Sequence, residues 1–184
     1  AWGYNNVYQL GDGTSQNRGY AQKVLIGRQP HDQDSDIYLM NIRAIAAGDT
    51  FAGAVDRNGF VYTWGSNNTA QLGNASTANA STPVRVLAGV SAAGANQGSL
   101  TYRSTAVDQY LRDVVELTAG ENHFVALRDD GSVYAWGSNG NGRLGTEYTA
   151  VAAPSGNSAG NYLSVPHPVT RAQNEPGRDD ASGV

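Results

Sequence analysis

Residues 119–145 read AGENHFVALRDDGSVYAWGSNGNGRLG, and the chain contains this stretch more than once. Residues 47–73, AGDTFAGAVDRNGFVYTWGSNNTAQLG, align with it without a gap and are identical to it at 12 of the 27 positions. A third, shorter copy begins at Trp2-Gly3 and ends at Leu10-Gly11. Such self-similarity indicates a repeat protein, in which each unit buries its apolar face against the next unit.

Each of the longer copies predicts a short β-hairpin. An Asn58-Gly59 or Asp130-Gly131 step separates two runs that are rich in aromatic and β-branched residues. Glycine at such a step accepts the positive φ that a tight hairpin turn requires. We therefore expect strands at residues 51–55, 60–64, 123–127 and 132–136.

Two further apolar pieces complete each unit. One is residues 42–45, with its counterpart 114–117, just before each Ala-Gly step. The other is residues 83–86, echoed by Pro168-Val169 and loosely by residues 23–26. Four short strands in each stretch of about 60 to 70 residues are typical of a propeller blade. The expected fold class is therefore all-β, with β-propeller blades of four antiparallel strands in an incomplete ring.

The repeated pattern is also specific in its residues. The run from Ala-Gly through Tyr-x-Trp-Gly-Ser-Asn to Leu-Gly resembles the repeat of the regulator of chromosome condensation family, which builds seven-bladed β-propellers. His123 matches the histidine common in that motif, whereas the earlier copy has Phe51 at this place. The resemblance covers most of residues 1–15, 42–87 and 111–146. A tryptophan–aspartate repeat propeller is the alternative within the same architecture, but Trp-Gly in place of Trp-Asp argues against it.

The length of the chain limits how much of a ring it can form. We expect its 184 residues to form a portion of one propeller domain, about three blades of a probable seven. The repeat units extend approximately over residues 1–41, 42–110 and 111–184, and the first and last are incomplete. Because an open propeller leaves unpaired strand edges, we expect further blades from the same or another chain.

Two kinds of apolar side chain recur once per unit. The tryptophans at one such position are Trp2, Trp64 and Trp136. We interpret them as buried packing residues, because a carbohydrate platform would need exposed rings. The leucines at the other position are Leu10, Leu72 and Leu144, and we expect each to anchor its turn-rich loop to the core.

The composition excludes several kinds of partner. The net charge is −4, only 15% of the residues are charged, and Lys23 is the single lysine, so charge does not support nucleic-acid binding. The chain has no cysteine, which excludes disulfides and thiolate metal sites. No apolar run approaches the roughly 18 residues of a membrane span. Abundant Gly, Asn, Ser and Thr with scarce Lys favour an extracellular or cell-surface location, with the cytoplasm as the alternative.

Three insertions distinguish the units, and recognition is expected there because loops vary while the scaffold repeats. They are residues 28–40, 88–110 and 146–165. The first two occupy corresponding positions in their units, so they should project from the same side. The second insertion supplies the candidate binding residues, namely Tyr102, Arg103, Gln109 and Tyr110.

The first insertion contains a candidate calcium site. Asp32, Asp34 and Asp36 alternate at a spacing that could wrap a Ca²⁺ ion. An EF-hand loop would need Gly after the third acidic position and Glu at position twelve, where the chain has Ile37 and Arg43. A looser calcium loop and a solvated acidic loop are the two interpretations that stay open. No other cofactor is expected.

The histidines do not indicate a catalytic site. His31 lies in the acidic insertion, His123 begins a predicted core strand, and His167 stands between two prolines. None of them pairs with another at a zinc-ligand spacing. We expect His123 to hydrogen-bond the backbone of an adjacent turn. The sequence predicts no catalytic residue and no enzyme activity.

These observations favour a non-catalytic binding scaffold in a secreted or surface-appendage bacterial protein, which recognises a protein or a glycan through the insertions between its strands. The family resemblance implies two alternatives. One is guanine-nucleotide exchange on a small GTPase, although neither the wedge nor the basic tail that accompanies this activity is recognisable here. The other is inhibition of a secreted enzyme such as a β-lactamase. No nucleic-acid partner and no membrane insertion are expected.

Overall fold

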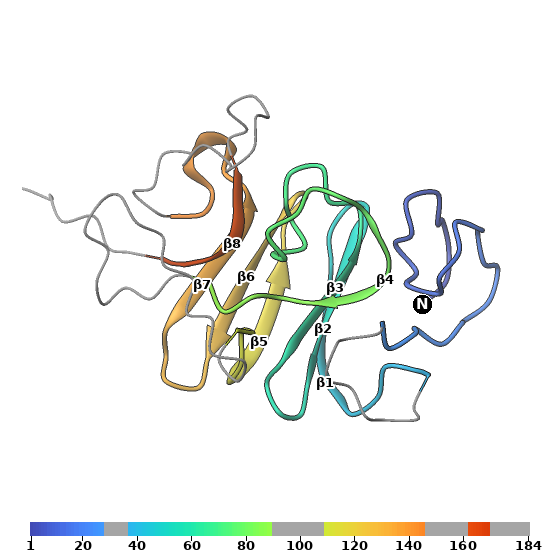
Figure 1. The fold of residues 1–184 in the computed structure, drawn as a ribbon, viewed down its shortest axis with the longest axis horizontal. Coiled ribbons are helices and arrows are strands. Elements are labelled where there is room, and N and C mark those ends of the chain that lie inside the picture. Colours follow the sequence, from blue (N-terminus) through green and yellow to red (C-terminus); the bar gives the residue numbers. More distant parts are fainter. Residues whose placement is uncertain (28–36, 90–108, 146–161, 170–184) are drawn as a thin grey trace, which may run out of the picture.

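The computed structural model describes residues 1–27, 37–89, 109–145 and 162–169, which include two four-stranded antiparallel sheets (Figure 1). The first blade consists, in spatial order, of β1 (Ile42–Ala47), β2 (Phe51–Asp56), β3 (Val61–Gly65) and β4 (Ala80–Arg85). The second consists of β5 (Val114–Ala119), β6 (His123–Arg128), β7 (Val133–Ser138) and β8 (Tyr162–Pro168). A short 3-10 turn, η1 (Gly140–Gly142), follows β7. The all-β class and the four-stranded blades are thus confirmed.

The two predicted hairpins form as expected. In the first blade, β2 pairs with β3 so that Phe51 lies opposite Gly65. In the second, β6 pairs with β7 so that His123 lies opposite Gly137. Gly59 and Gly131 adopt φ values of +82° and +81° in the turns. A side chain at either position would be strained, which is why both copies keep glycine there.

The outer strand of the second blade differs from the predicted register. Tyr134 of β7 pairs with Pro168 where Tyr62 of β3 pairs with Arg85. Pro166-His167 therefore corresponds to Pro83-Val84, and the predicted echo at Pro168-Val169 was wrong by two residues. Both Pro166 and Pro168 could be aligned with Pro83 from the sequence, and only the strand pairing shows that Pro166 is its counterpart. Because β8 begins at Tyr162, it also includes the end of the third predicted insertion, residues 146–165.

Residues 1–27 form the N-terminal segment, which lies beside the first blade (Figure 1). The loosely predicted strand at residues 23–26 is reduced to an isolated bridge between Leu25 and Tyr38, and a second bridge joins Gly3 to Arg18. The indole Nε1 of Trp64 donates a hydrogen bond of 3.0 Å to the Gln9 carbonyl, which links the first blade to this segment. The second blade repeats the link, since Trp136 Nε1 donates to the Gln71 carbonyl at 3.0 Å.

The hydrophobic core lies between the two sheets. Phe51 and Phe124 meet edge to face with centroids 4.9 Å apart, and Phe124 lies 5.4 Å from Trp136. The same cluster includes Val55, Val61, Leu72, Val86, Leu111, Val114, Leu117 and Ala126. Because both blades contribute to one cluster, each buries the apolar face that the other would leave exposed.

The recurring tryptophans confirm the expected burial at two of three positions. Trp64 and Trp136 are 4% and 0% exposed, but Trp2 is 70% exposed, so the expectation for Trp2 was wrong. The loop of the preceding unit covers each buried ring. A Cβ atom at Gly11 would lie 2.9 Å from the Trp64 ring, and one at Gly73 would lie 2.7 Å from the Trp136 ring. No described residue offers Trp2 such a loop.

The leucines Leu10, Leu72 and Leu144 are at most 4% exposed, which confirms that they anchor their loops.

Within the described ranges, no helix has the length and apolar character needed to cross a membrane.

Candidate binding surface

The first two insertions leave the same end of the blades. At the first, Leu25 bridges to Tyr38, and Leu39 N donates to Val24 O at 2.9 Å. At the second, Leu87 bridges to Tyr110 in the same way. The hairpin tips, residues 56–60 and 128–132, lie at this end too. The first residue of β1 pairs with the last residue of β2, just before the first tip, and β5 and β6 pair in the same way before the second tip. We call this end of both blades the insertion side.

A cation lies over a tyrosine ring at each insertion base. Lys23 Nζ is 4.7 Å from the centroid of Tyr38, and the Arg85 guanidinium is 5.4 Å from that of Tyr110. The same guanidinium lies 5.1 Å from the Phe60 ring. Cation–π attraction of this kind holds Tyr38 against the N-terminal segment and Tyr110 against β4. The repetition shows that these tyrosines help to hold the base of each insertion.

Aspartates order the two hairpin tips. Asp56 Oδ1 accepts from the backbone N of Asn58 at 2.9 Å and of Phe60 at 3.0 Å. In the second hairpin, Asp130 Oδ1 accepts from the backbone N of Ser132 at 2.9 Å and also from its hydroxyl. Hydrogen bonds from Ser132 to the carboxylate, together with the nearby Arg128, hold the pKa of Asp130 below its usual range. Both tips are therefore fixed loops of defined shape.

Charges of both signs are interspersed on the insertion side. Arg128 bonds Asp130 at 2.8 Å and Asp113 at 3.2 Å, while Arg57 and Asn58 are exposed at the first tip. The charged residues are Lys23, Arg57, Arg85, Arg112 and Arg128 with Asp56, Asp113, Asp129 and Asp130. A mixed surface suits a protein partner of complementary charge better than a uniformly anionic nucleic-acid backbone.

The structure describes two of the four predicted binding residues. Gln109 and Tyr110 lie at the base of the second insertion, where the Gln109 carbonyl accepts from Ala88 N at 2.9 Å. Tyr102 and Arg103 lie outside the described residues, and so do the calcium candidates Asp32, Asp34 and Asp36. Their roles stay predictions. Among the described residues, no cluster of three or more acidic or histidine side chains could hold a metal ion.

The opposite end of the blades carries loops organised by a buried asparagine. Asn67 Nδ2 donates to Ser76 O at 2.9 Å and to Ala78 O at 3.0 Å, and its Oδ1 accepts from Leu72 N at 2.9 Å. Asn5 makes the equivalent set of bonds in the N-terminal segment. The sequence indicated only a turn here. The asparagine repeated after each Trp-Gly pair was the available signal for this arrangement.

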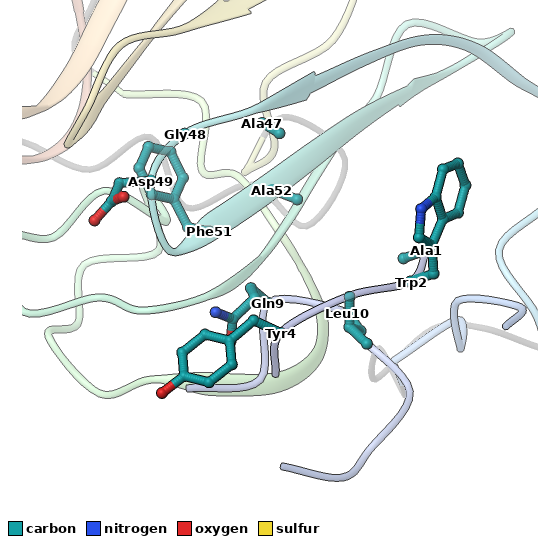
Figure 2. Close-up of a pocket in the computed structure, with 10 residues that line it drawn as sticks. All are labelled: Ala1, Trp2, Tyr4, Gln9, Leu10, Ala47, Gly48, Asp49, Phe51 and Ala52. Atoms are coloured by element: carbon teal, nitrogen blue, oxygen red, sulfur yellow. The ribbon is translucent and has the colours of Figure 1, made fainter. Parts of the chain in front are cut away.

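A hollow lies between the N-terminal segment and the first blade (Figure 2). Its volume is about 280 Å³. Figure 2 shows Ala47 and Ala52 on one wall, with Trp2 and Leu10 on the other. Gln9 and Asp49 contribute its polar side chains. The lining is mainly apolar and combines alanines with the aromatic residues Trp2, Tyr4 and Phe51.

The described histidines are wholly or partly buried. The His123 ring packs over Gly120, where a Cβ atom would lie 2.1 Å from the imidazole. The Nδ1 atom of His123 is buried and has no hydrogen-bond partner, so the expected bond to an adjacent turn is not formed by this atom. Burial lowers the pKa of His123, and the charge of Arg143 adds to the effect. His167 is 3% exposed, and burial lowers its pKa as well.

The sequence of the repeated hairpin and of the turn that follows it matches a known repeat. The regulator of chromosome condensation (RCC1) repeat matches residues 58–127 and 130–178, and a second profile of this repeat matches residues 114–143. The chain belongs to the RCC1 repeat family. These matches confirm the resemblance that the sequence motif indicated.

Three curated relatives are similar to this chain in sequence. The chain is 30% identical to Protein pim1 of Schizosaccharomyces pombe over 171 residues, 90% of the chain and 27% of the relative. It is 34% identical to Protein RCC1 of Candida albicans over 100 residues, 54% of the chain and 18% of the relative. It is 30% identical to the human E3 ubiquitin-protein ligase HERC2 over 144 residues, 78% of the chain and 2% of the relative. The chain thus spans about a quarter or less of these relatives.

A solved structure shows the same fold. Prp20p of Saccharomyces cerevisiae, described together with its binding to Gsp1p and histones, aligns with a TM-score of 0.57 and 17% identity. The alignment covers 93% of the chain and 34% of Prp20p. The described blades are therefore a portion of an RCC1-type propeller.

Proposed function

We propose that this chain is a protein-binding portion of an RCC1 propeller, and that the insertion side is its contact surface. One observation carries the proposal, namely that the same repeats match relatives with very different names. HERC2 is named as an E3 ubiquitin-protein ligase, whereas the names of pim1 and RCC1 mention no ligase. The chain matches only 2% of HERC2, so the similarity concerns the repeats and not the whole ligase. What such proteins share in this region is a rigid scaffold, which supplies binding surfaces in repeat proteins.

The insertion side supports this proposal by its shape and charge. Hydrogen bonds to Asp56 and Asp130 fix the two hairpin tips. A partner can therefore bind the exposed side chains of the tips without a large loss of conformational entropy. Arg57 and Asn58 are exposed there, and opposite charges lie nearby. Interspersed charge of this kind selects a complementary protein surface and speeds the encounter with it.

Binding to defined probes tests the proposal. The labelled chain is titrated separately with Gsp1p and with histones, the proteins named with Prp20p. We expect saturable binding to at least one of them. Arg57→Glu reverses an exposed charge on the insertion side and should weaken binding about tenfold or more. Arg143→Glu makes the same change at the opposite end and should leave binding within about twofold. No binding, or equal weakening by both variants, would contradict the proposal.

Guanine-nucleotide exchange on a small GTPase is the second candidate function. The matches to Protein pim1 and Protein RCC1 favour it over recognition outside the cell, because the family resemblance implies exchange. If the chain is an exchange factor, it should accelerate release of a labelled guanine nucleotide from at least one GTPase of a panel. Unchanged release from every GTPase would remove this candidate and leave protein binding untouched. An extracellular location stays a prediction from composition alone.

A further inference from the structure

The hairpin tips of the two blades have the same backbone arrangement but differ in charge. Each tip donates a backbone hydrogen bond of 2.9 Å to the residue before the first strand of its blade, from Arg57 N to Asn41 O and from Asp129 N to Asp113 O. Positions 41, 57 and 58 of the first blade therefore correspond to 113, 129 and 130 of the second. The first set is Asn, Arg and Asn, whereas the second is Asp at all three positions.

Ion pairs balance the charges of the second tip. Arg128 bonds Asp130 at 2.8 Å and Asp113 at 3.2 Å, and Arg112 Nε lies 3.7 Å from an Asp113 carboxylate oxygen. The cations and anions of this tip are thus partners of one another. A charged segment of another protein would have to compete with these pairs.

The charge of the first tip has no such balance. Asp56 is only 8% exposed, and its carboxylate accepts hydrogen bonds from Asn58 N, from Phe60 N and from the Tyr62 hydroxyl. Arg57 is exposed, and its guanidinium forms no ion pair with any residue that the structure describes. The first tip therefore presents a positive charge that a carboxylate of a partner can neutralise.

Exposed apolar side chains lie beside this charge. Met40 precedes Asn41, the residue that accepts the hydrogen bond from Arg57 N, and it is 53% exposed. Ile37, at the same insertion base, is 62% exposed. The second unit has the polar residues Arg112 and Gln109 at these two positions. The first tip thus combines an unbalanced cation with apolar surface, and the second tip has neither.

This exposure does not depend on whether another blade adjoins. Arg112 has the whole first blade before it, yet its side chain is 46% exposed, so the equivalent position of Met40 is at the surface in a complete array too. Arg57 has the second blade after it, and it is exposed although Val114 N donates to the Gly59 carbonyl of the same tip at 3.2 Å. We use the name first-tip patch for Ile37, Met40, Asn41, Arg57 and Asn58.

We propose that the first-tip patch binds an acidic segment of a partner protein in which an apolar side chain lies beside carboxylates. The planar guanidinium of Arg57 can donate two parallel hydrogen bonds to one carboxylate. The flexible thioether chain of Met40 can adapt to the apolar side chain. The second tip would repel such a segment, because Asp129 and Asp130 are exposed at the equivalent positions. This inference rests on the proposed function, since it names the kind of partner that the insertion side takes.

Synthetic peptides test the proposal. The probe is the fluorescent peptide Ser-Asp-Glu-Leu-Leu-Asp-Glu-Ser, which is titrated into the full chain and followed by anisotropy. We expect saturable binding that weakens as the salt concentration rises. Arg57→Asp should weaken it about tenfold or more. The second blade carries Asp129 at the equivalent position, so a hairpin tip of this kind accommodates the aspartate. Arg112→Asp changes the net charge equally at the second tip and should leave the affinity within about twofold.

A second peptide, with Ser in place of both Leu residues, tests the apolar contact. It should bind more weakly than the first peptide. Met40→Ser should weaken binding of the Leu peptide about threefold and leave binding of the Ser peptide unchanged, because only the first pair loses a contact.

Three results would overturn the proposal. They are absence of binding to the Leu peptide, equal weakening by Arg57→Asp and Arg112→Asp, and equal affinity for the Leu and Ser peptides. The proposed function fails separately. If the peptide does not bind while Gsp1p or histones bind in a manner that Arg57→Glu weakens, the acidic-segment inference is wrong and the insertion side is still the contact surface.

Discussion

A single asparagine per unit holds each large loop. Asn67 is fully buried, and its amide bonds three loop groups at 2.9 to 3.0 Å, namely Ser76 O, Ala78 O and Leu72 N. Asn5 repeats this arrangement, and Asn139 Oδ1 accepts from Leu144 N at 3.2 Å. A buried amide that satisfies several backbone groups at once stabilises a loop that has no regular structure of its own.

Replacing this asparagine should therefore destabilise the fold. We expect Asn67→Ala to lower the free energy of unfolding by about 3 kcal/mol, because several buried backbone groups lose their partner. Urea denaturation followed by circular dichroism measures the change. Asn68→Ala, at the exposed neighbouring position, should change the free energy by less than about 0.5 kcal/mol. Equal effects of the two substitutions would contradict this role of Asn67.

A buried histidine should make stability depend on pH. His167 stands in β8 where the first blade has Val84, and desolvation by burial lowers its pKa below 6.5 in the folded state. The unfolded chain then binds more protons than the folded chain at mildly acidic pH. This contribution to stability is complete above pH 6.5 and is lost as the pH falls below that value.

The variant His167→Val should remove this part of the pH dependence. We expect its melting temperature to fall less than that of the parent chain between pH 7.5 and pH 5, measured by differential scanning calorimetry. His123 contributes in the same direction, since its pKa is also lowered, so some dependence should persist. An identical fall in the two proteins would show that His167 does not titrate in this way.

At the scale of elements, close backbone contacts fix how one blade lies against the next. A Cβ atom at Gly89, just beyond β4, would lie 1.9 Å from the carbonyl oxygen of Pro166 in β8, and Gly89 has φ +73°. A Cβ atom at Gly27 would likewise lie 1.8 Å from the carbonyl oxygen of Pro83 in β4. Only glycine allows this approach, since any side chain would clash with the strand backbone at Pro166 or Pro83, which cannot shift without moving the rest of its sheet.

An added methyl group at Gly89 should push the segment that follows β4 away from β8. We expect Gly89→Ala to lower the free energy of unfolding by about 3 kcal/mol, from the clash with Pro166 and from the positive φ. Thermal or urea denaturation measures it. Gly19→Ala is the matched control, because a Cβ at Gly19 meets nothing within 4 Å. A tolerated Gly89→Ala would mean that the segment after β4 does not lie as close to Pro166 as described.

For the whole molecule, one core joins the two blades. Phe124 is fully buried between Phe51 of the first blade and Trp136 of its own sheet. A cluster shared across the interface couples the blades, because unfolding of either one would expose the apolar face of the other. The described blades should therefore unfold together.

A cavity at the shared core should affect both sheets. We expect Phe124→Ala to lower the free energy of unfolding by about 4 kcal/mol and to leave a single transition. Ile45→Ala, at an exposed apolar position, should change it by less than about 0.5 kcal/mol. Coincident midpoints from tryptophan fluorescence and far-UV circular dichroism would support coupling. Separate midpoints for the two probes would contradict it.

The predictions from sequence succeeded where the information is local and repeated. The hairpins at Gly59 and Gly131 follow from adjacent residues, and comparison of two copies strengthens each assignment. The outer strand was harder, because Pro166 and Pro168 offer the same local pattern in two registers. The candidate surface was found only in part. Gln109 and Tyr110 lie at an insertion base, but nothing in the sequence distinguished the exposed Arg57 as part of the surface.

The repeat, the four-stranded blade, the hairpin turns and the membership of the RCC1 family are all recognisable from local sequence, because each depends on residues close together along the chain. Which tryptophans are buried follows only from packing in space, because the loop of the preceding unit covers Trp64 and Trp136. Trp2 and Trp64 are each followed by Gly and, three residues after the Trp, by Asn, yet they are 70% and 4% exposed. Burial depends on what the adjacent unit places against a side chain, and a local pattern contains no record of that contact.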